Sequence, residues 1–292
     1  MNFYQLAYFK KVSETNSITR AAEELLITQP AVSKQMKALE EELGERLFDR
    51  IGKKIYLTRT GEVLYSHTDR ILRSVEEAKI AVRDMSAECS GELIIGTSDH
   101  ISIHRLPGVL KSFINGFPKV DLKLRCHRSE TILDLVNRNL VDLGVITLPN
   151  PTPHMVSKTI WKDPMSLVFV RDHPLASVAV VRLRDIARYG MILPEVGTET
   201  RKTIDSAFSK KGLTPNIAME VAYLETIKSL VRVGLGISIL PDKAFEAEIK
   251  SGLLAKANIA DASFSRDLGV VYLKDKFLSK PVQEFLKLVE SA

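Results

Sequence analysis

Apolar residues at the beginning of the chain recur with the spacing of a helix. Phe3, Leu6, Phe9 and Val12 follow one another at intervals of three residues, with polar residues between them. This pattern predicts an amphipathic helix over residues 2–15 that turns one face toward a core.

A second helical pattern follows after a short break. Ser17 can cap the next helix, and Ala21, Ala22 and Leu25 give that helix an inward face. The alanines are small, which favours a close crossing with a neighbouring helix. Residues 26–27 are expected to close a tight turn.

A third helix is predicted to begin after Thr28, which is a suitable N-cap, and to end at Gly44. Pro30 fits the first turn, where its missing N–H has no partner. Apolar residues at 4-3-4 spacing are expected to pack inward: Val32, Met36, Leu39 and Leu43. Polar residues on the other faces are expected to stay free: Gln29, Ser33, Lys34 and Lys37. Two short helices joined by a tight turn are typical of a DNA-binding helix-turn-helix.

The next stretch is basic. Residues 52–54 have the composition of a hairpin tip, and residues 55–57 that of a returning strand, which together predict a wing that contacts phosphates. Within residues 46–59 only Asp49 opposes the bases Arg46, Arg50, Lys53, Lys54 and Arg59. Residues 1–59 carry 10 basic and 8 acidic side chains, a balance of +2. The prediction of DNA binding therefore depends on where the Lys and Arg side chains lie, and not on the net charge.

Residues 60–88 keep a 4-3 alternation of apolar positions over three heptads, with one polar exception. The positions are Leu64, Thr68, Ile71, Val75, Ala78, Val82 and Met85. We interpret the stretch as a long helix that forms a coiled-coil seam with a second copy of the chain. A helix packed on its own domain stays open as the alternative.

From residue 92 onward, strand and helix patterns alternate as in a parallel sheet covered by helices. We expect strands at 92–97, 120–126, 141–146, 165–170, 191–193, 217–221, 237–240 and 268–273, and helices at 106–115, 131–139, 183–188, 200–211, 226–232 and 280–289. The last strand and helix are expected to return to the first lobe. The chain would then cross between two lobes twice, near residues 161–164 and 263–267, which predicts a hinged cleft.

Composition adds little to this picture. The net charge of +5 permits contact with nucleic acid without requiring it. Cys89 and Cys126 lack metal-site spacing and indicate incidental thiols in a reducing cytosol. Neither a signal peptide nor a membrane-spanning run is found, so we expect a cytoplasmic protein without a membrane partner.

The sequence gives no sign of an enzyme. His100 and His104 lie four residues apart without the intervening Glu of a zinc protease. Ser98, Asp99 and His100 are sequence neighbours, which is not how a catalytic triad is assembled. We expect no catalytic residue, no metal and no cofactor.

The combination resembles the LysR-type transcriptional regulators. The resemblance is carried by AAEELLITQPAVSKQMKALEEELGERLFDR, by LTRTGEVLY and by VGLGISILP, and it is most specific over residues 1–66. It implies an α/β chain with an all-α-type winged helix-turn-helix N-terminal domain and a two-lobed effector domain like the periplasmic binding proteins. The expected domains are the helix-turn-helix domain (1–59), a dimerisation helix (60–89) and an effector-binding domain (90–292), the last made of lobe I (90–162 and 266–292) and lobe II (163–265).

The resemblance also implies partners. We expect homodimers or homotetramers that bind double-stranded promoter DNA, bend it and respond to a small, anionic effector, with RNA polymerase as a further candidate partner. The expected DNA contacts are Thr28, Gln29, Pro30, Ser33, Lys34, Lys37, Arg50, Lys53 and Lys54. Gln29, Ser33 and Lys34 are candidates for base contacts, since Gln can pair bidentately with adenine. Candidates for phosphate contacts are Thr28, Lys37, Arg50, Lys53 and Lys54.

The effector is expected where strands end and helices begin at the cleft, because hydroxyls and free N–H groups there bind anions. The candidates are Thr97, Ser98, Asp99, His100, Ser129, Thr131, Thr147, Gly197 and Thr198. Plain helix capping is the alternative role for each Ser and Thr. Asp99 and Glu130 place carboxylates near the site, and Arg201, His100 or Arg105 could compensate for them.

Two other functions were considered for the whole chain. A solute-binding protein of the transport type would explain the lobes but would need a signal peptide. A ligand-independent architectural DNA binder would not need a cleft.

Overall fold

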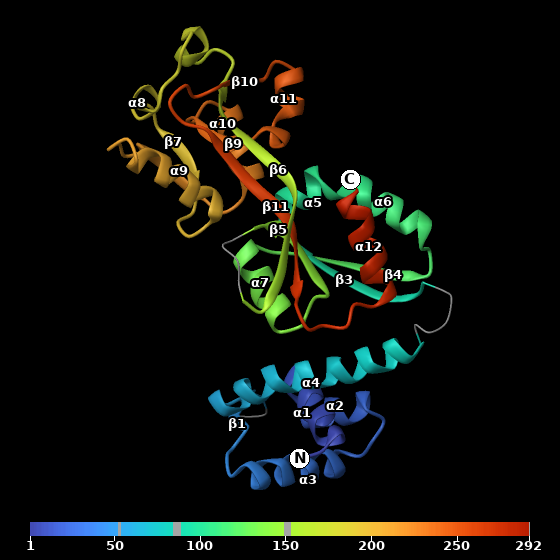
Figure 1. Ribbon diagram of the computed structural model, residues 1–292. Helices are drawn as coiled ribbons and strands as arrows, with labels where there is room; N and C mark the ends of the chain where they lie inside the picture. Colours follow the sequence, from blue (N-terminus) through green and yellow to red (C-terminus); the bar gives the residue numbers. More distant parts are fainter. Residues whose placement is uncertain (52–53, 84–88, 149–152, 292) are drawn as a thin grey trace. The chain divides into compact units, whose positions relative to one another are not determined.

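The computed structural model describes residues 1–51, 54–83, 89–148 and 153–291 (Figure 1). The chain divides into two compact units, residues 1–88 with 138–140 and residues 89–137 with 141–292. Within the described ranges, no helix has the length and apolar character needed to cross a membrane.

Three helices form the core of the first unit, as predicted. They are α1 (Phe3–Thr15), α2 (Ile18–Glu24) and α3 (Gln29–Leu43). Ala21 and Ala22 are buried where α2 meets α3, and Phe9, Val32 and Leu39 fill the space between the helices. The Ser17 hydroxyl accepts a hydrogen bond from the N–H of Arg20, which confirms its role as N-cap of α2.

Two details of the third helix differ from the prediction. Leu43 is 39% exposed, because the helix ends there and its last turn lies beyond the core. Thr28 stands at the N-cap position, but its side chain makes no capping hydrogen bond. Gly44 ends the helix in the left-handed conformation at φ 71°, as expected of a C-terminal glycine.

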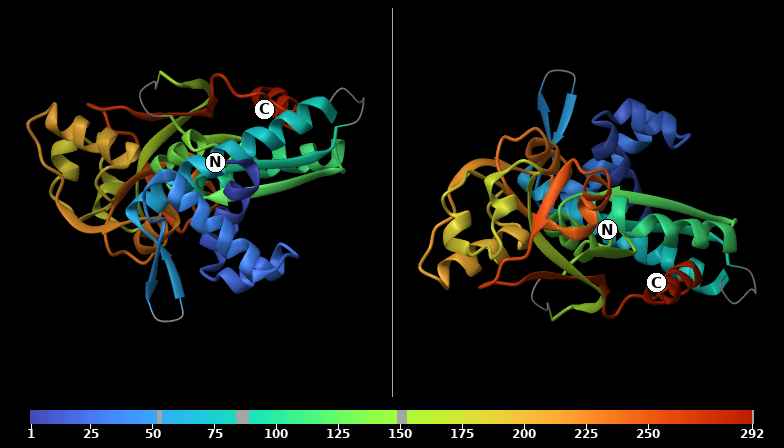
Figure 2. Two further views of the ribbon diagram at one scale, coloured as in Figure 1. Left: turned by 90° about the horizontal axis from the view of Figure 1, so that it is seen from below. Right: turned by 90° about the horizontal axis from the view of Figure 1, so that it is seen from above.

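The wing is an antiparallel hairpin, and Figure 2 shows it standing out from the helices of its unit. It comprises β1 (Phe48–Ile51) and β2 (Lys54–Leu57). The carboxylate of Glu40 accepts hydrogen bonds from the N–H groups of Leu47 and Phe48, so α3 holds the beginning of the hairpin. The predicted tip at Gly52 and Lys53 lies outside the described residues.

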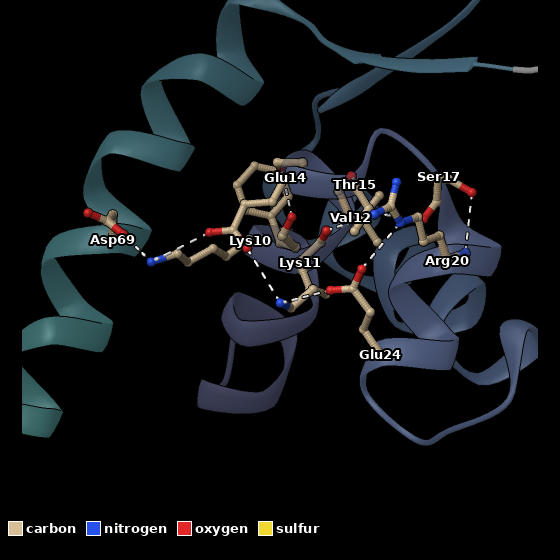
Figure 3. A network of polar contacts seen from close by, with 11 residues as sticks. Lys10, Lys11, Val12, Glu14, Thr15, Ser17, Arg20, Glu24 and Asp69 are labelled. Carbon is tan, nitrogen blue, oxygen red and sulfur yellow. Dashed lines mark hydrogen bonds and ion pairs between the residues drawn. The ribbon is translucent and has the colours of Figure 1, made fainter.

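A long helix, α4 (Arg59–Arg83), follows the wing. Its first turn lies so close to the preceding chain that a Cβ on Gly61 would stand 2.2 Å from the carbonyl oxygen of Leu47. A polar network joins α1, α2 and α4 (Figure 3). In it, Lys10 pairs with Asp69 of α4, and Lys11 pairs with Glu24 of α2 at 3.3 Å.

The predicted apolar stripe of α4 is only partly covered in the single chain. Thr68 is buried, Leu64 and Val75 are half-buried, and Ile71 is 40% exposed. The side chain of Val82 and the whole of Met85 lie outside the described residues.

Lobe I is a three-layer structure. β3 pairs in parallel with β4 and β5. Phe113 of α6 and Phe285 of α12 pack on one face of these strands, while Ile132 and Val136 of α7 pack on the other (Figure 1). The elements are β3 (Gly91–Thr97), α5 (Asp99–His104), α6 (Leu106–Gly116), β4 (Val120–Cys126), α7 (Ser129–Asn137), β5 (Leu143–Thr147) and α12 (Lys280–Glu290).

Lobe II repeats the layered plan. Ile204 and Phe208 of α9 pack on one side of its strands, and Ile227 and Val231 of α10 on the other. The elements are the 3-10 turn η1 (Pro174–Ser177), α8 (Leu183–Ile186), β7 (Met191–Pro194), α9 (Glu199–Ser209), β8 (Ile217–Val221), α10 (Leu224–Arg232), β9 (Ser238–Pro241), η2 (Asp242–Ala244), α11 (Glu246–Lys250) and β10 (Leu254–Ala257). The sequence prediction missed α5, η1, η2, α11 and β10, which are all shorter than seven residues.

Two long antiparallel strands, β6 (Met155–Val170) and β11 (Phe264–Leu273), connect the lobes. Trp161 and Leu268 belong to the core of lobe I, whereas Met165 and Phe264 belong to the core of lobe II. Both strands therefore cross between the lobes where the sequence predicted.

The sheet is mixed, not parallel throughout. β6 pairs antiparallel with β9, β10 and β11, and β11 pairs antiparallel with β5. One continuous sheet of seven strands thus runs through both lobes. The expectation of a parallel sheet was wrong here because both connecting strands, β6 and β11, run opposite to the strands beside them.

Candidate DNA-binding surface and effector cleft

The beginning of α3 presents its predicted polar residues to solvent. Thr28, Gln29, Pro30, Lys34 and Lys37 are exposed, and Ser33 is half-buried. The buried positions of the same helix are Val32, Met36 and Leu39, so α3 is anchored on one face and free on the other. That placement suits insertion of a helix into a DNA groove.

Of the predicted DNA-contacting cations, Lys37 has an acidic partner in the same helix. Lys37 lies 3.5 Å from Glu41 one turn later, in an exposed ion pair that DNA phosphates could displace. For Arg50 and Lys54 the structure describes the backbone of the hairpin but not the side chains, and Lys53 lies outside the described residues.

A cavity of about 90 Å³ lies at the ends of strands and the beginnings of helices of both lobes. The predicted residues that line it are Ser98, Asp99, His100, Ser129, Thr147 and Thr198. The structure therefore brings together six of the nine effector candidates in one cleft.

The other three candidates do not line the cavity. Thr97 is fully buried, and its hydroxyl donates a 2.9 Å hydrogen bond to the carbonyl of Val145 in the neighbouring strand. Thr131 and Gly197 are absent from the cavity wall. Each of the three is a sequence neighbour of a lining residue.

A buried ionic centre lies between the two connecting strands. Asp163 of β6 is the register partner of Arg266 of β11, and their side chains meet at 2.5 Å. Arg105 donates to the other oxygen of Asp163 at 2.8 Å. Arg266 also donates to the hydroxyl of Thr200 at 2.7 Å and lines the cavity. The centre therefore joins residues of both lobes beneath the cleft.

Asp163 is ionised at neutral pH. Burial by itself would raise the pKa of this carboxyl, but contact with His100 and the guanidinium groups of Arg266 and Arg105 hold the pKa well below its usual range. Burial lowers the pKa of Arg266, yet arginine keeps its charge at any ordinary pH.

His100 lies against this centre without a hydrogen bond. Its Nε2 is 3.4 Å from Asp163, the residue is 5% exposed, and neither ring nitrogen has a hydrogen-bond partner among the described residues. Burial lowers the pKa of His100, which favours the neutral ring. An unsatisfied buried polar group costs about 1–3 kcal/mol, so this ring is a site where a polar ligand atom would be stabilised.

Two contacts join the lobes across the cleft. Arg128, next to Ser129, pairs with Glu195 of lobe II at 2.7 Å. His104 of α5 contacts Glu225 of α10 at 2.7 Å. The hydrogen bond from His104, together with Lys228, lowers the pKa of Glu225 to about 2. Both contacts depend on the present separation of the lobes.

Sequence reasoning missed several residues of the cavity wall. The main ones are His127, Arg128, Pro194, Tyr223 and Arg266. Arg128 could have been found because it directly precedes the helix that begins at Ser129. Arg266 could not, because its place depends on pairing with a strand about a hundred residues earlier.

The two other cations named from the sequence have structural partners. Arg201 pairs with Asp205 at 2.9 Å and with Glu220 at 2.6 Å, and it does not line the cavity. Arg105 is held by Asp163. In the described ranges, no group of three or more His, Cys, Asp or Glu side chains could hold a metal ion.

Comparison with known proteins gives a consistent result. Residues 3–62 match the family of bacterial regulatory helix-turn-helix proteins of the lysR type, and residues 86–292 match the LysR substrate binding domain. The HTH-type transcriptional regulator CysB of Burkholderia cenocepacia is 33% identical over 87% of this chain and 82% of its own length. The HTH-type transcriptional activator CmpR of Synechocystis is 30% identical over 97% and 93%.

A solved structure agrees in fold over the whole chain. Full-length CbnR, in complex with its target DNA, superimposes with a TM-score of 0.73 at 23% identity and covers 100% of this chain and 99% of its own. All of these named relatives are regulators, which agrees with the expectation that the chain is not an enzyme. The chain therefore belongs to the LysR family and is a DNA-binding transcriptional regulator, with a helix-turn-helix domain followed by a LysR substrate-binding domain.

Proposed function

We propose that the protein binds its promoter DNA through α3 and the wing, and that a small molecule in the interlobe cleft controls this binding and the bending of the DNA. The observation that supports it most is that six sequence-predicted residues from both lobes line one cavity, while Arg128 and His104 bridge its two sides. A ligand there contacts both lobes and so favours one separation of them over another.

In this proposal the exposed residues at the beginning of α3 enter the major groove. Gln29, Ser33 and Lys34 make base contacts, Thr28 and Lys37 lie at the phosphates, and Pro30 belongs to the same contact surface. Arg50, Lys53 and Lys54 of the wing add phosphate contacts. Support comes from the exposure of α3 and from the fold shared with CbnR, which has been crystallised on its target DNA.

We further propose that α4 forms the dimer. Met1, Leu43, Val63, Leu64 and Ile71 line an apolar groove at the beginning of this helix. Such a stripe is unfavourable in water and is suited to a helix of a second copy. Residues 1–59, 60–89 and 90–292 are then the DNA-binding, dimerising and effector domains, and pairs of dimers make the tetramer.

The effector in this scheme carries an acid group. Ser98, Ser129 and Thr147 contribute hydroxyls, and α7 and α9 point their amino ends at the cavity. The Thr198 hydroxyl caps α9 instead, because it accepts from the N–H of Arg201 and donates to the carbonyl of Glu195. The regulator is expected to act in the cytoplasm, where its DNA is, with RNA polymerase as the machinery that it recruits or blocks.

A gel-shift series tests the DNA-binding role. Gln29→Ala should weaken binding to the upstream region of its own gene more than binding to random DNA, by about 1–3 kcal/mol, because a bidentate base contact is lost. Glu23→Ala, on the exposed side of α2, serves as the control. Equal losses on both DNAs would exclude a base-reading role for Gln29.

The effector role is tested by a thermal-shift screen of metabolites on the full chain. A ligand that binds only the native fold raises the melting temperature. The same ligand should change the DNA bend measured by fluorescence energy transfer between labelled promoter ends. A ligand that raises the melting temperature but leaves the bend unchanged contradicts the regulatory part of the proposal.

A further inference from the structure

The charges of the effector cleft are unevenly partnered. Arg266 and Arg105 share Asp163, and Arg128 pairs with Glu195. Each guanidinium at or behind the cavity therefore already has a carboxylate within 3 Å. A ligand anion would have to compete with these carboxylates for the cations.

Two carboxylates of the same cavity have no such partner. Asp99 and Glu130 line it, and neither side chain has a hydrogen bond or an ion pair among the described residues. Lys202 is close enough to Glu130 for an electrostatic effect, but it forms its ion pair with Glu199 at 2.7 Å. Among the described residues, Asp99 and the exposed Glu130 are thus the charged side chains of the cavity wall without an ion pair, and the Nε of Arg266 is a buried donor without a hydrogen bond.

His100 provides an independent sign of a ligand beside these carboxylates. It is 5% exposed and follows Asp99 directly in the cavity wall. Among the described residues neither ring nitrogen has a hydrogen bond, and the carboxylate of Asp163 lies 3.4 Å from Nε2. A neutral imidazole offers one N–H donor and one acceptor nitrogen. An ammonium group can donate to that acceptor and contact the neighbouring carboxylate at the same time.

Hydroxyls free to meet an acid group lie close by. Ser98 stands at the N-cap of α5, but its side chain makes no capping hydrogen bond. Ser129 begins α7, whose first amides have no partner within the helix. The cavity therefore combines an acceptor side, formed by Asp99, Glu130 and His100, with a donor side, formed by Ser98 and the beginning of α7.

We propose that the effector is a zwitterion of the amino-acid class, with its amine on Asp99, Glu130 and His100 and its acid group on Ser98, Ser129 and the first amides of α7. The inference depends on the proposed function, since it names the ligand class of the same cleft. The inference adds an amine to the acid group that the proposed function already gives the effector, because a cationic amine would pair with the carboxylates of Asp99 and Glu130.

The test compares matched ligands on the full chain. Calorimetric titrations use each standard amino acid and the 2-hydroxy acid of the same side chain, which differ only in the amine. At least one amino acid should bind, and its hydroxy acid should bind about tenfold more weakly or worse, because a charge-assisted hydrogen bond is lost. A hydroxy acid that binds as tightly as its amino acid overturns the inference.

Variants locate the contact. Asp99→Asn combined with Glu130→Gln should remove the preference for the amine while leaving the fold intact. Glu284→Gln, a carboxylate on α12 away from the cavity, should keep it. If the double variant retains the full preference, the amine does not bind at these carboxylates and the assignment is wrong. If it does not fold, the wild-type comparison decides alone.

A third measurement separates this inference from the proposed function. The low-molecular-mass fraction of an extract from cells that carry the gene is added in a thermal-shift assay. If the extract raises the melting temperature and no amino acid does, the cleft binds an effector of another class, and only the inference fails. If neither has an effect, the proposed effector control fails with it.

Discussion

Replacing Asp163 by Asn should destabilise the second unit strongly. Asp163 is 0% exposed and compensates two guanidinium groups, those of Arg266 and Arg105. Asn has no charge, so both guanidiniums would remain buried without a counter-ion. Removing one partner of a buried ion pair costs about 3–5 kcal/mol. That is a large part of the roughly 5–15 kcal/mol that stabilises a typical domain.

The same pair of strands supplies a matched control. Asp267 is the register partner of Lys162, one position from the Arg266 and Asp163 pair, and it meets Lys162 at 2.6 Å. These side chains are 42% and 72% exposed, so their ion pair contributes only about 0–1 kcal/mol. Asp163→Asn and Asp267→Asn thus remove the same charge from adjacent residue pairs of the two strands, one pair buried and the other exposed.

The assay uses the only tryptophan of the chain. Trp161 lies in β6 two residues from Asp163 and packs on the core of lobe I, so its fluorescence follows urea unfolding of this unit. We expect Asp163→Asn to lower the free energy of unfolding by about 3–5 kcal/mol and Asp267→Asn by less than about 1. A difference between the two variants below about 1 kcal/mol would refute the reasoning.

The effect of pH has a definite sign. The pKa of Asp163 is lower in the folded than in the unfolded chain, where it has its ordinary value of 3.8. The carboxylate therefore stabilises the fold fully above that value, and this contribution is lost as the pH falls through the lower, folded pKa. The stability gap between the wild type and Asp163→Asn should be constant near neutrality and should narrow below about pH 4.

Three further outcomes are expected. Gly61→Ala should destabilise the first unit by about 1–3 kcal/mol in thermal unfolding, because the new Cβ would stand 2.2 Å from the Leu47 carbonyl oxygen. Gly108→Ala is the control, and it should cost far less because the space around its Cβ position is open. Leu26→Gly should leave stability unchanged or raise it by up to about 1 kcal/mol, because Leu26 is 93% exposed and has φ 57°; a clear loss would mean that the leucine packs. Glu195→Ala with Glu225→Ala removes both cross-cleft contacts and should increase the radius of gyration of the ligand-free second unit in small-angle scattering. An unchanged radius would show that the contacts do not hold the lobes.

The elements that sequence reasoning placed well are those specified locally. The helices of the first unit follow from apolar spacing and from caps at Ser17 and Gly44, whose partners lie within a few residues. Each strand of the second unit longer than four residues was also found, at least in part. Short elements such as α5 and β10 were missed, because they have neither enough residues for a clear periodicity nor the apolar run that revealed β7 and β9.

In the candidate site too, the predicted residues are those with a local sequence signal, and the missed ones depend on contacts distant in sequence. Ser98 and Ser129 were found because a polar residue after a strand or before a helix is a local signal. Arg266 and Asp163 were not, since their contact joins residues about a hundred positions apart. Thr97 does not line the cavity, because its hydroxyl donates to the carbonyl of Val145 in a neighbouring strand that the local pattern does not reveal.

The continuous sheet built on β6 and β11 has a consequence for protein engineering. Neither half of the second unit is a contiguous piece of chain, and each contains part of both long strands. A fragment cut to isolate one half would expose an unpaired strand edge and tend to aggregate. Hybrids that exchange specificity with a relative should therefore transplant the whole of residues 89–291, or else single side chains within it.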